Sequence, residues 1–169
     1  LIACWKVAPA LAAGNSVVLK PASLTPLTAL MLGQLAQEAG LPDGVLQVVP
    51  GSGSEAGNAL ATHPLVRKIG FTGSTEVGAT IMKLAADDIK RVSLELGGKS
   101  PNIVFADADW QRAAAESPMS VFANTGQDCC ARSRMFIEQS VFDGFVDQFV
   151  AATESLKIGA PMDEAPQVG

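Results

Sequence analysis

The chain has 169 residues, a formal net charge of −5, 48% hydrophobic residues and 17% charged residues. This composition excludes a disordered or fibrous protein, and the acidic balance disfavours nucleic acid as a partner because phosphate binding requires a basic surface. No apolar run reaches the roughly 20 residues of a membrane-spanning helix, so we expect no membrane partner. Three cysteines, two of them adjacent, make a poor disulfide framework, which favours a reducing compartment such as the cytoplasm.

Short apolar runs alternate with helix-like segments in the first part of the chain. Thr25 followed by Pro26 predicts the start of a helix, with Thr25 as its cap, and Gly40 predicts its end. Because the alternation repeats with short loops, we expect an α/β fold with a doubly wound parallel sheet. The expected strands are 16–19, 45–49, 66–71 and 91–96, and the expected helices are 1–13, 26–39, 55–62 and 75–86.

The pattern changes after Gly98. Strands are expected at 102–105 and 134–137, and a last helix at 142–156. Asp107 or Asp109 caps a further helix, which Pro118 is expected to interrupt. We therefore place a domain boundary between residues 97 and 98.

Two stretches at expected strand edges carry groups suited to covalent catalysis. One is Asn124-Thr-Gly-Gln-Asp-Cys129-Cys130, and the other is Leu94-Glu-Leu-Gly-Gly-Lys-Ser-Pro101. A cysteine thiol can act as a nucleophile and a carboxylate as a general base. Each catalytic role has a structural alternative. Cys129 and Cys130 could be cysteines of the hydrophobic core, and Glu95 could form an ion pair with Arg91 or Lys99.

Several other residues fall at expected strand ends, where parallel sheets bind ligands. The segment Gly51-Ser-Gly-Ser-Glu-Ala-Gly57 resembles a dinucleotide glycine fingerprint but has a different final spacing. The turn at Gly73 and Ser74 is either an anion site at a helix N-terminus or a helix cap. Lys20 either bonds ribose hydroxyls or lies on the surface.

A metal site is not expected. His63 is the single histidine, and Cys4 is the third thiol; neither has the usual spacing of zinc ligands. We interpret His63 as structural.

Taken together, the motifs resemble those of the aldehyde dehydrogenase superfamily over essentially the whole chain. They are Lys20-Pro-Ala, Phe71-Thr-Gly-Ser-Thr-Glu-Val-Gly78, Leu94-Glu-Leu-Gly-Gly-Lys-Ser-Pro-Asn102 and Asn124-Thr-Gly-Gln-Asp-Cys129. The resemblance implies part of a dinucleotide-binding domain at 1–97 and part of a catalytic domain at 98–169. It also implies a central fragment of a longer enzyme that is inactive alone, and a parent that is a homodimer or homotetramer.

The resemblance also implies the role of each site residue. Cys129 is the nucleophile and Glu95 the general base, while Lys20 bonds the adenosine ribose, Ser74 contacts the pyrophosphate and Val77 packs beside the adenine. The further cofactor-binding residues are Ser23, Gly53, Gly57, Gly73, Leu96 and Gly97.

The implied reaction is oxidation of a small aldehyde to a carboxylic acid with NAD or NADP, through a cysteine thiohemiacetal and thioester. Ser23 departs from a glutamate that many members carry, which leaves the choice of cofactor open. Arg132 stands where members of that superfamily commonly carry glycine after the cysteines. We have no interpretation of this difference. The alternatives are a coenzyme-A-acylating enzyme and a non-catalytic binding protein with the same fold.

Overall fold

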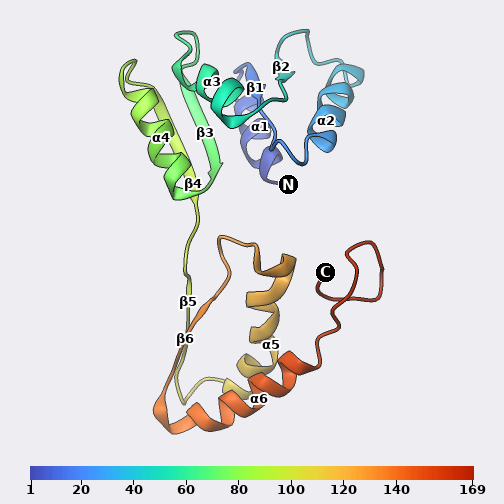
Figure 1. The fold of residues 1–169 in the computed structure, drawn as a ribbon, viewed down its shortest axis with the longest axis vertical. Coiled ribbons are helices and arrows are strands. Elements are labelled where there is room, and N and C mark those ends of the chain that lie inside the picture. The colour runs from blue at the N-terminus through green and yellow to red at the C-terminus, as the bar shows by residue number, and fades with distance from the viewer. The chain divides into compact units, whose positions relative to one another are not determined.

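The computed structural model describes residues 1–169, which form two compact units, Leu1–Glu95 and Leu96–Gly169 (Figure 1). The division lies two residues before the predicted domain boundary. No helix in either unit combines the length and the apolar character that crossing a bilayer demands.

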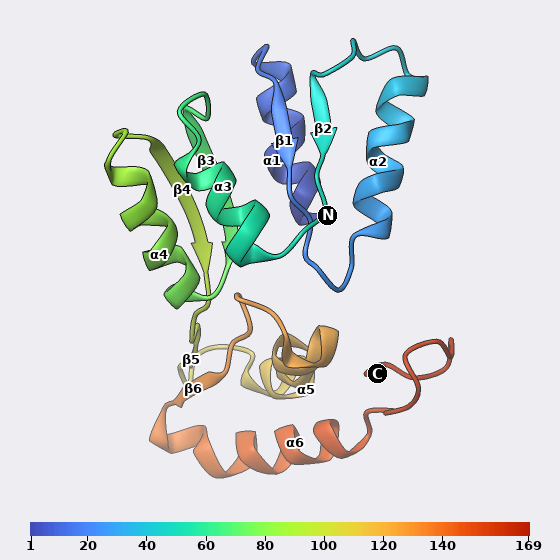
Figure 2. The same ribbon diagram turned by 45° about the horizontal axis from the view of Figure 1, so that its top comes forward.

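The first unit alternates helices and strands as the sequence predicts. Parallel strands β1 and β2 pair with Val17 opposite Leu46 and Leu19 opposite Val48, and β3 pairs with β4. In Figure 2, α1 packs beside β1 and α2 beside β2. The elements are α1 (Ile2–Ala12), β1 (Val17–Leu19), α2 (Leu27–Glu38), β2 (Leu46–Val48), a π-helical turn (Gly53–Gly57), α3 (Asn58–Thr62), β3 (Lys68–Gly73), α4 (Thr75–Ala86) and β4 (Arg91–Leu96).

The α/β class with parallel strands is confirmed, and the strands of this unit form two separate pairs. No ladder of backbone hydrogen bonds joins the β1–β2 pair to the β3–β4 pair, so the expected continuous sheet consists here of two ribbons. The parallel β1–β2 pair places the ends of both strands at one edge.

The predicted boundaries of α2 are confirmed at one end only. Gly40 follows the helix with φ of +83°, a left-handed conformation that glycine adopts without steric cost. The capping role of Thr25 is wrong: the N-cap is Pro26, no side chain caps the helix, and the Thr25 N–H donates to the carbonyl of Ala22. The carbonyl of Pro26 accepts the first helical hydrogen bonds, so the helix starts one residue later than expected.

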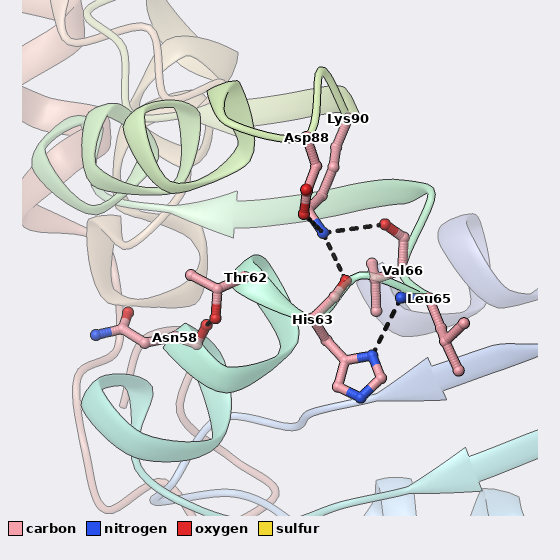
Figure 3. A network of polar contacts seen from close by, with 7 residues as sticks. All are labelled: Asn58, Thr62, His63, Leu65, Val66, Asp88 and Lys90. Carbon is pink, nitrogen blue, oxygen red and sulfur yellow. Dashed lines mark hydrogen bonds and ion pairs between the residues drawn. The ribbon is translucent and has the colours of Figure 1, made fainter.

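A buried lysine ties the loop after α3 to the turn before β4 (Figure 3). The side chain of Lys90 is 1% exposed; its ammonium contacts Asp88 at 2.8 Å and donates to the carbonyl oxygens of His63 and Val66. An ammonium has three donors, and three acceptors surround this one. His63 accepts a hydrogen bond from the Leu65 N–H at Nδ1, which agrees with its predicted structural role.

The second unit places two helices against a parallel pair of strands. Its elements are β5 (Pro101–Val104), α5 (Trp110–Phe122), a 3-10 turn (Ala123–Gly126), β6 (Arg134–Ile137), a 3-10 turn (Gln139–Val141) and α6 (Phe142–Glu154). Strands β5 and β6 run parallel with Ile103 opposite Phe136. Helices α5 and α6 pack on each other (Figure 1), and the core consists of Val104, Ala114 and Phe145.

Asp109 is the residue that caps α5, since its carboxylate accepts from the Arg112 N–H at 3.1 Å. The expected interruption at Pro118 is wrong, because α5 runs through it to Phe122. Pro118 is fully buried, so packing of its ring offsets the backbone hydrogen bond that proline cannot donate. The neighbouring Ser117 hydroxyl accepts from the Asn102 amide at 2.9 Å.

Candidate active site

The first group of predicted residues meets at the ends of β1 and β2. The ammonium of Lys20 donates to the carbonyl oxygen of Gly51 at 3.3 Å and to that of Pro21 at 2.7 Å. The hydroxyl of Ser23 donates to the same Gly51 carbonyl at 3.3 Å. Parallel pairing of β1 with β2 brings these segments together although 31 residues separate Lys20 from Gly51. Two of the three donors of Lys20 are used, which leaves one for a ligand.

Two predicted glycines belong to the turn that follows β2. Ser52 caps this turn by accepting from the Glu55 N–H at 3.1 Å. A Cβ atom at Gly53 would meet nothing within 4 Å, so a ligand can approach the backbone there. A Cβ atom at Gly57 would lie 3.8 Å from the stem of Lys20. The structure therefore brings Lys20, Ser23, Gly53 and Gly57 into one neighbourhood.

The second group lies where β3 meets α4. The Ser74 hydroxyl accepts from the Val77 N–H at 3.2 Å, which makes Ser74 the cap of a 12-residue helix. Gly73 precedes it, and a Cβ atom there would lie 2.5 Å from the ring of Phe71. Val77 is half-exposed on the first turn. The capping alternative is thus present in the structure, and the pyrophosphate contact of Ser74 stays a prediction.

Glu95 lies on an exposed position of β4. It forms no ion pair with Arg91, so that structural alternative is absent. The Glu95 side chain is exposed rather than buried. The role of Glu95 as general base stays a prediction.

The residues after Glu95 lie beside the cysteine loop within the second unit. A Cβ atom at Gly98 would lie 3.0 Å from the carbonyl oxygen of Cys129, an approach that only glycine permits without a shift. Leu96 is half-buried, and Gly97 is exposed with no atom within 4 Å of a would-be Cβ. Gly98 therefore allows the cysteine loop to approach the backbone closely at the start of the second unit.

The loop that precedes the cysteines is held in an unusual backbone conformation. Asn124, Thr125 and Gly126 have φ of 53°, 61° and 71°, and left-handed values are costly for a β-branched threonine. Asn124 closes the turn, since its side-chain amide donates to the Gln127 carbonyl at 2.9 Å and its carbonyl accepts from the Gln127 N–H. After the cysteines, the Arg132 N–H donates to the Ser120 carbonyl at 3.1 Å, which attaches the loop to α5.

Cys129 and Cys130 are both exposed, so the core-cysteine alternative is wrong. Their sulfur atoms lie 3.7 Å apart. The hydrogen bond with the Cys130 thiol, followed by the charge of Cys130, raises the pKa of Cys129, and the Asp128 carboxylate adds to this rise. A thiolate nucleophile requires a lowered pKa, so in these surroundings Cys129 is held as a thiol.

Comparison with known proteins decides the family. The profile of the aldehyde dehydrogenase family matches residues 1–169. The chain belongs to the aldehyde dehydrogenase family.

Its relatives include both enzymes of known activity and solved structures. The chain is 55% identical over 160 residues to human cytosolic 10-formyltetrahydrofolate dehydrogenase, which covers 94% of this chain and 18% of that protein. It is 51% identical to phenylacetaldehyde dehydrogenase of Pseudomonas fluorescens, over 100% of this chain and 34% of that one. A crystal structure of indole-3-acetaldehyde dehydrogenase in complex with NAD+ superposes with a TM-score of 0.96 at 50% identity, covering 99% of this chain and 34% of that one.

This aldehyde dehydrogenase chain therefore spans between about a fifth and a third of the length of the relatives it matches. The predicted family and fold class are confirmed, whereas the roles of individual residues stay predictions.

One contact in the aldehyde dehydrogenase chain was not anticipated from the sequence. The ammonium of Lys6 on α1 donates to the Thr72 hydroxyl on β3 at 2.7 Å, and its stem passes 3.5 Å from a would-be Cβ at Gly70. A single charge in an otherwise apolar helix was the available signal, since a half-buried ammonium requires an acceptor.

Proposed function

We propose that the protein that carries this chain oxidises a small aldehyde to a carboxylic acid with NAD or NADP. The observation that carries the proposal is the exposed Cys129 thiol, held in a backbone loop that the Gly98 backbone approaches closely. Family membership supports the class of reaction.

The residues near Gly51 fit the ribose end of a nicotinamide dinucleotide. Lys20 keeps one free donor, Gly53 leaves open space above its backbone, and both lie at strand ends. The N-terminus of α4, at Ser74, offers N–H groups and a helix dipole to a phosphate. The NAD+ complex of the related indole-3-acetaldehyde dehydrogenase supports this class of cofactor. When bound, the nicotinamide would accept the hydride that leaves the substrate carbon.

The chain's own residues account for the two halves of the reaction. Cys129 attacks the aldehyde carbonyl, which forms a thiohemiacetal and, after hydride loss, a thioester. Glu95 then takes a proton from water, and the hydroxide equivalent releases the acid and the free thiol. Because the pKa of Cys129 is raised, its thiol must lose a proton as the sulfur attacks the carbonyl carbon.

The remaining assignments follow from this function. We assign residues 1–97 to the dinucleotide-binding domain and residues 98–169 to the catalytic domain; the two compact units support a division at this place. A homodimer or homotetramer and a cytoplasmic location belong to the same proposal, and three exposed free cysteines agree with a reducing compartment.

The decisive experiment replaces the nucleophile in the intact protein that carries this chain. Cys129→Ser should reduce aldehyde oxidation by several orders of magnitude while NAD binding is retained, because a hydroxyl is a far poorer nucleophile than a thiolate at neutral pH. Cys4→Ser, which removes an exposed thiol from α1, is the matched control and should keep the parental rate. Substantial oxidation by Cys129→Ser would refute the assignment.

A further inference from the structure

Cys129 and Cys130 form a vicinal pair of exposed thiols. Their sulfur atoms lie 3.7 Å apart, and the Asp128 carboxylate completes a group whose ligand atoms all fall within 4.8 Å of one another. Asp128 is held in place because its Oδ1 accepts from the Cys130 N–H at 3.0 Å. The proposed oxidation uses only one of these two thiols, so the second has no assigned chemistry.

Backbone geometry disfavours a direct disulfide between these neighbours. Adjacent Cα atoms lie about 3.8 Å apart across a trans peptide, whereas unstrained disulfides have Cα atoms about 4.4–6.8 Å apart. The sulfur atoms would also have to approach from 3.7 Å to about 2.05 Å. A single atom that bonds both sulfurs would avoid this strain, because it lets them remain apart.

We propose that Cys129 and Cys130 form a dithiol site that binds a trivalent organic arsenical by condensation. The arsenoxide R–As=O reacts with both thiols: two S–H bonds and the As=O bond break, two As–S bonds form, and the oxygen leaves as water with the two protons. Arsenic remains trivalent and both sulfurs keep their oxidation state, so no oxidant or reductant is consumed.

The local chemistry favours this ligand class. Soft sulfur donors prefer soft, thiophilic centres to hard cations. The raised pKa of Cys129 keeps this thiol protonated at neutral pH, which slows reagents that attack its thiolate. The condensation instead releases the protons of both thiols in the product water. Exposure of both sulfurs gives a bulky aryl arsenical access.

The expected consequence for activity rests on the proposed function. If Cys129 is the nucleophile, an occupied dithiol site blocks aldehyde oxidation. Binding itself does not depend on that role, so the two claims can fail separately.

The test uses phenylarsine oxide, added at one equivalent to the intact reduced protein. Peptide mapping by mass spectrometry should find one phenylarsenic group on the peptide that contains both Cys129 and Cys130, with neither thiol open to alkylation. A dithiol such as 2,3-dimercaptopropanol should release it, whereas excess monothiol should not.

Two variants separate chelation from attachment to one sulfur. Cys130→Ser keeps the Cys129 thiol but cannot be bridged, so retention against monothiol should fall on the order of 100-fold, the factor expected when a second, intramolecular bond is lost. Cys4→Ser removes a thiol on α1 and should bind like the parent.

Three outcomes would overturn the proposal: equal retention by Cys130→Ser and the parent, loss of binding in Cys4→Ser, or a mapped peptide with one alkylatable thiol. The mapping needs no variant, so it decides the question even if a variant misfolds. Bridged thiols together with undiminished aldehyde oxidation would instead refute the role of Cys129 as nucleophile and leave the dithiol site standing.

Discussion

At the scale of single residues, the role of Glu95 as general base is a prediction that one substitution can test. Glu95 lies at an exposed position of β4 and forms no ion pair with Arg91, so nothing in the first unit neutralises its charge. A carboxylate that is free of ion pairs can accept a proton, whereas an amide of the same shape cannot.

Glu95→Gln in the intact protein should therefore accumulate the thioester. We expect a burst of about one equivalent of reduced cofactor followed by slow turnover, because acyl transfer to cysteine proceeds and hydrolysis lacks its base. Rapid-mixing absorbance measurements check this. Glu76→Gln, an exposed substitution on the first turn of α4, should turn over like the parent. Steady turnover of Glu95→Gln at the parental rate would remove Glu95 from the mechanism.

The choice between NAD and NADP belongs to the same scale. Ser23 carries no charge, and its hydroxyl proton is directed to the Gly51 carbonyl, while the Lys20 ammonium donates to the same oxygen. A 2′-phosphate near Ser23 would meet the Lys20 ammonium, and position 23 itself carries no carboxylate to repel it. The geometry therefore favours acceptance of NADP as well as NAD.

Ser23→Glu should lower kcat/KM for NADP by about tenfold or more relative to NAD, since one charge-assisted hydrogen bond contributes about 1.5–3 kcal/mol and a carboxylate also repels phosphate. The measurement is the NADP to NAD ratio of kcat/KM in parent and variant. Ser16→Glu, which adds the same charge before β1, is the control and should leave the ratio unchanged. If Ser23→Glu does not move the ratio either, Ser23 does not face the ribose.

At the scale of elements, the first unit depends on connections that its short strands do not supply. Strands β1 and β2 have three residues each, so few backbone hydrogen bonds join them. At the β3–β4 pair, the hydrogen bonds and ion pair of Lys90 supply a further connection (Figure 3). One buried ammonium links the loop after α3 to the turn before β4. That turn includes Ile89 with φ of 51°, a strained value for a β-branched residue.

Lys90→Met should lower the free energy of unfolding by about 1–3 kcal/mol, because the Val66 carbonyl loses the ammonium donor and Asp88 loses its ion-pair partner, while the His63 carbonyl keeps only the Val66 N–H. Denaturant unfolding of the intact protein, followed at the transition of this domain, measures the change. Lys83→Met on α4 replaces an exposed lysine without a recorded hydrogen bond or ion pair and should change stability by less than about 0.5 kcal/mol. Equal stability of the two variants would show that the network contributes nothing.

At the scale of the whole molecule, large apolar side chains remain uncovered in each unit. On α2, Leu27 is 77% exposed and Met31 is 59% exposed. In the second unit, one face of the β5–β6 pair carries Ile103 and Phe136, which lie opposite each other and are 59% and 51% exposed. Contiguous apolar surface of this kind marks sites of association.

Residues 1–169 by themselves should therefore self-associate and should not oxidise aldehydes. Light scattering with size-exclusion chromatography tests the first part, and an NAD reduction assay tests the second. Ile103→Lys combined with Phe136→Glu places opposite charges on facing positions and should reduce the association. A monodisperse, active preparation of the unsubstituted residues 1–169 would contradict both expectations.

Local signals in the sequence determined the α/β alternation, the end of α2 at Gly40 and the motifs around Glu95 and Cys129. Periodicity and glycine positions act within a few residues, so they can be read without coordinates. They failed where packing overrides a local preference, as at the fully buried Pro118, which continues a helix that proline usually ends.

Only the tertiary structure decided the contacts between distant segments. Strand pairing joins Lys20 to the Gly51 carbonyl, and burial leaves the ammonium of Lys90 among three acceptors. The 3.7 Å between the sulfurs of Cys129 and Cys130 depends on the rotamers of the two side chains. Hydrogen-bond partners, exposure and pKa depend on which segments meet in space, and no spacing along the chain specifies that.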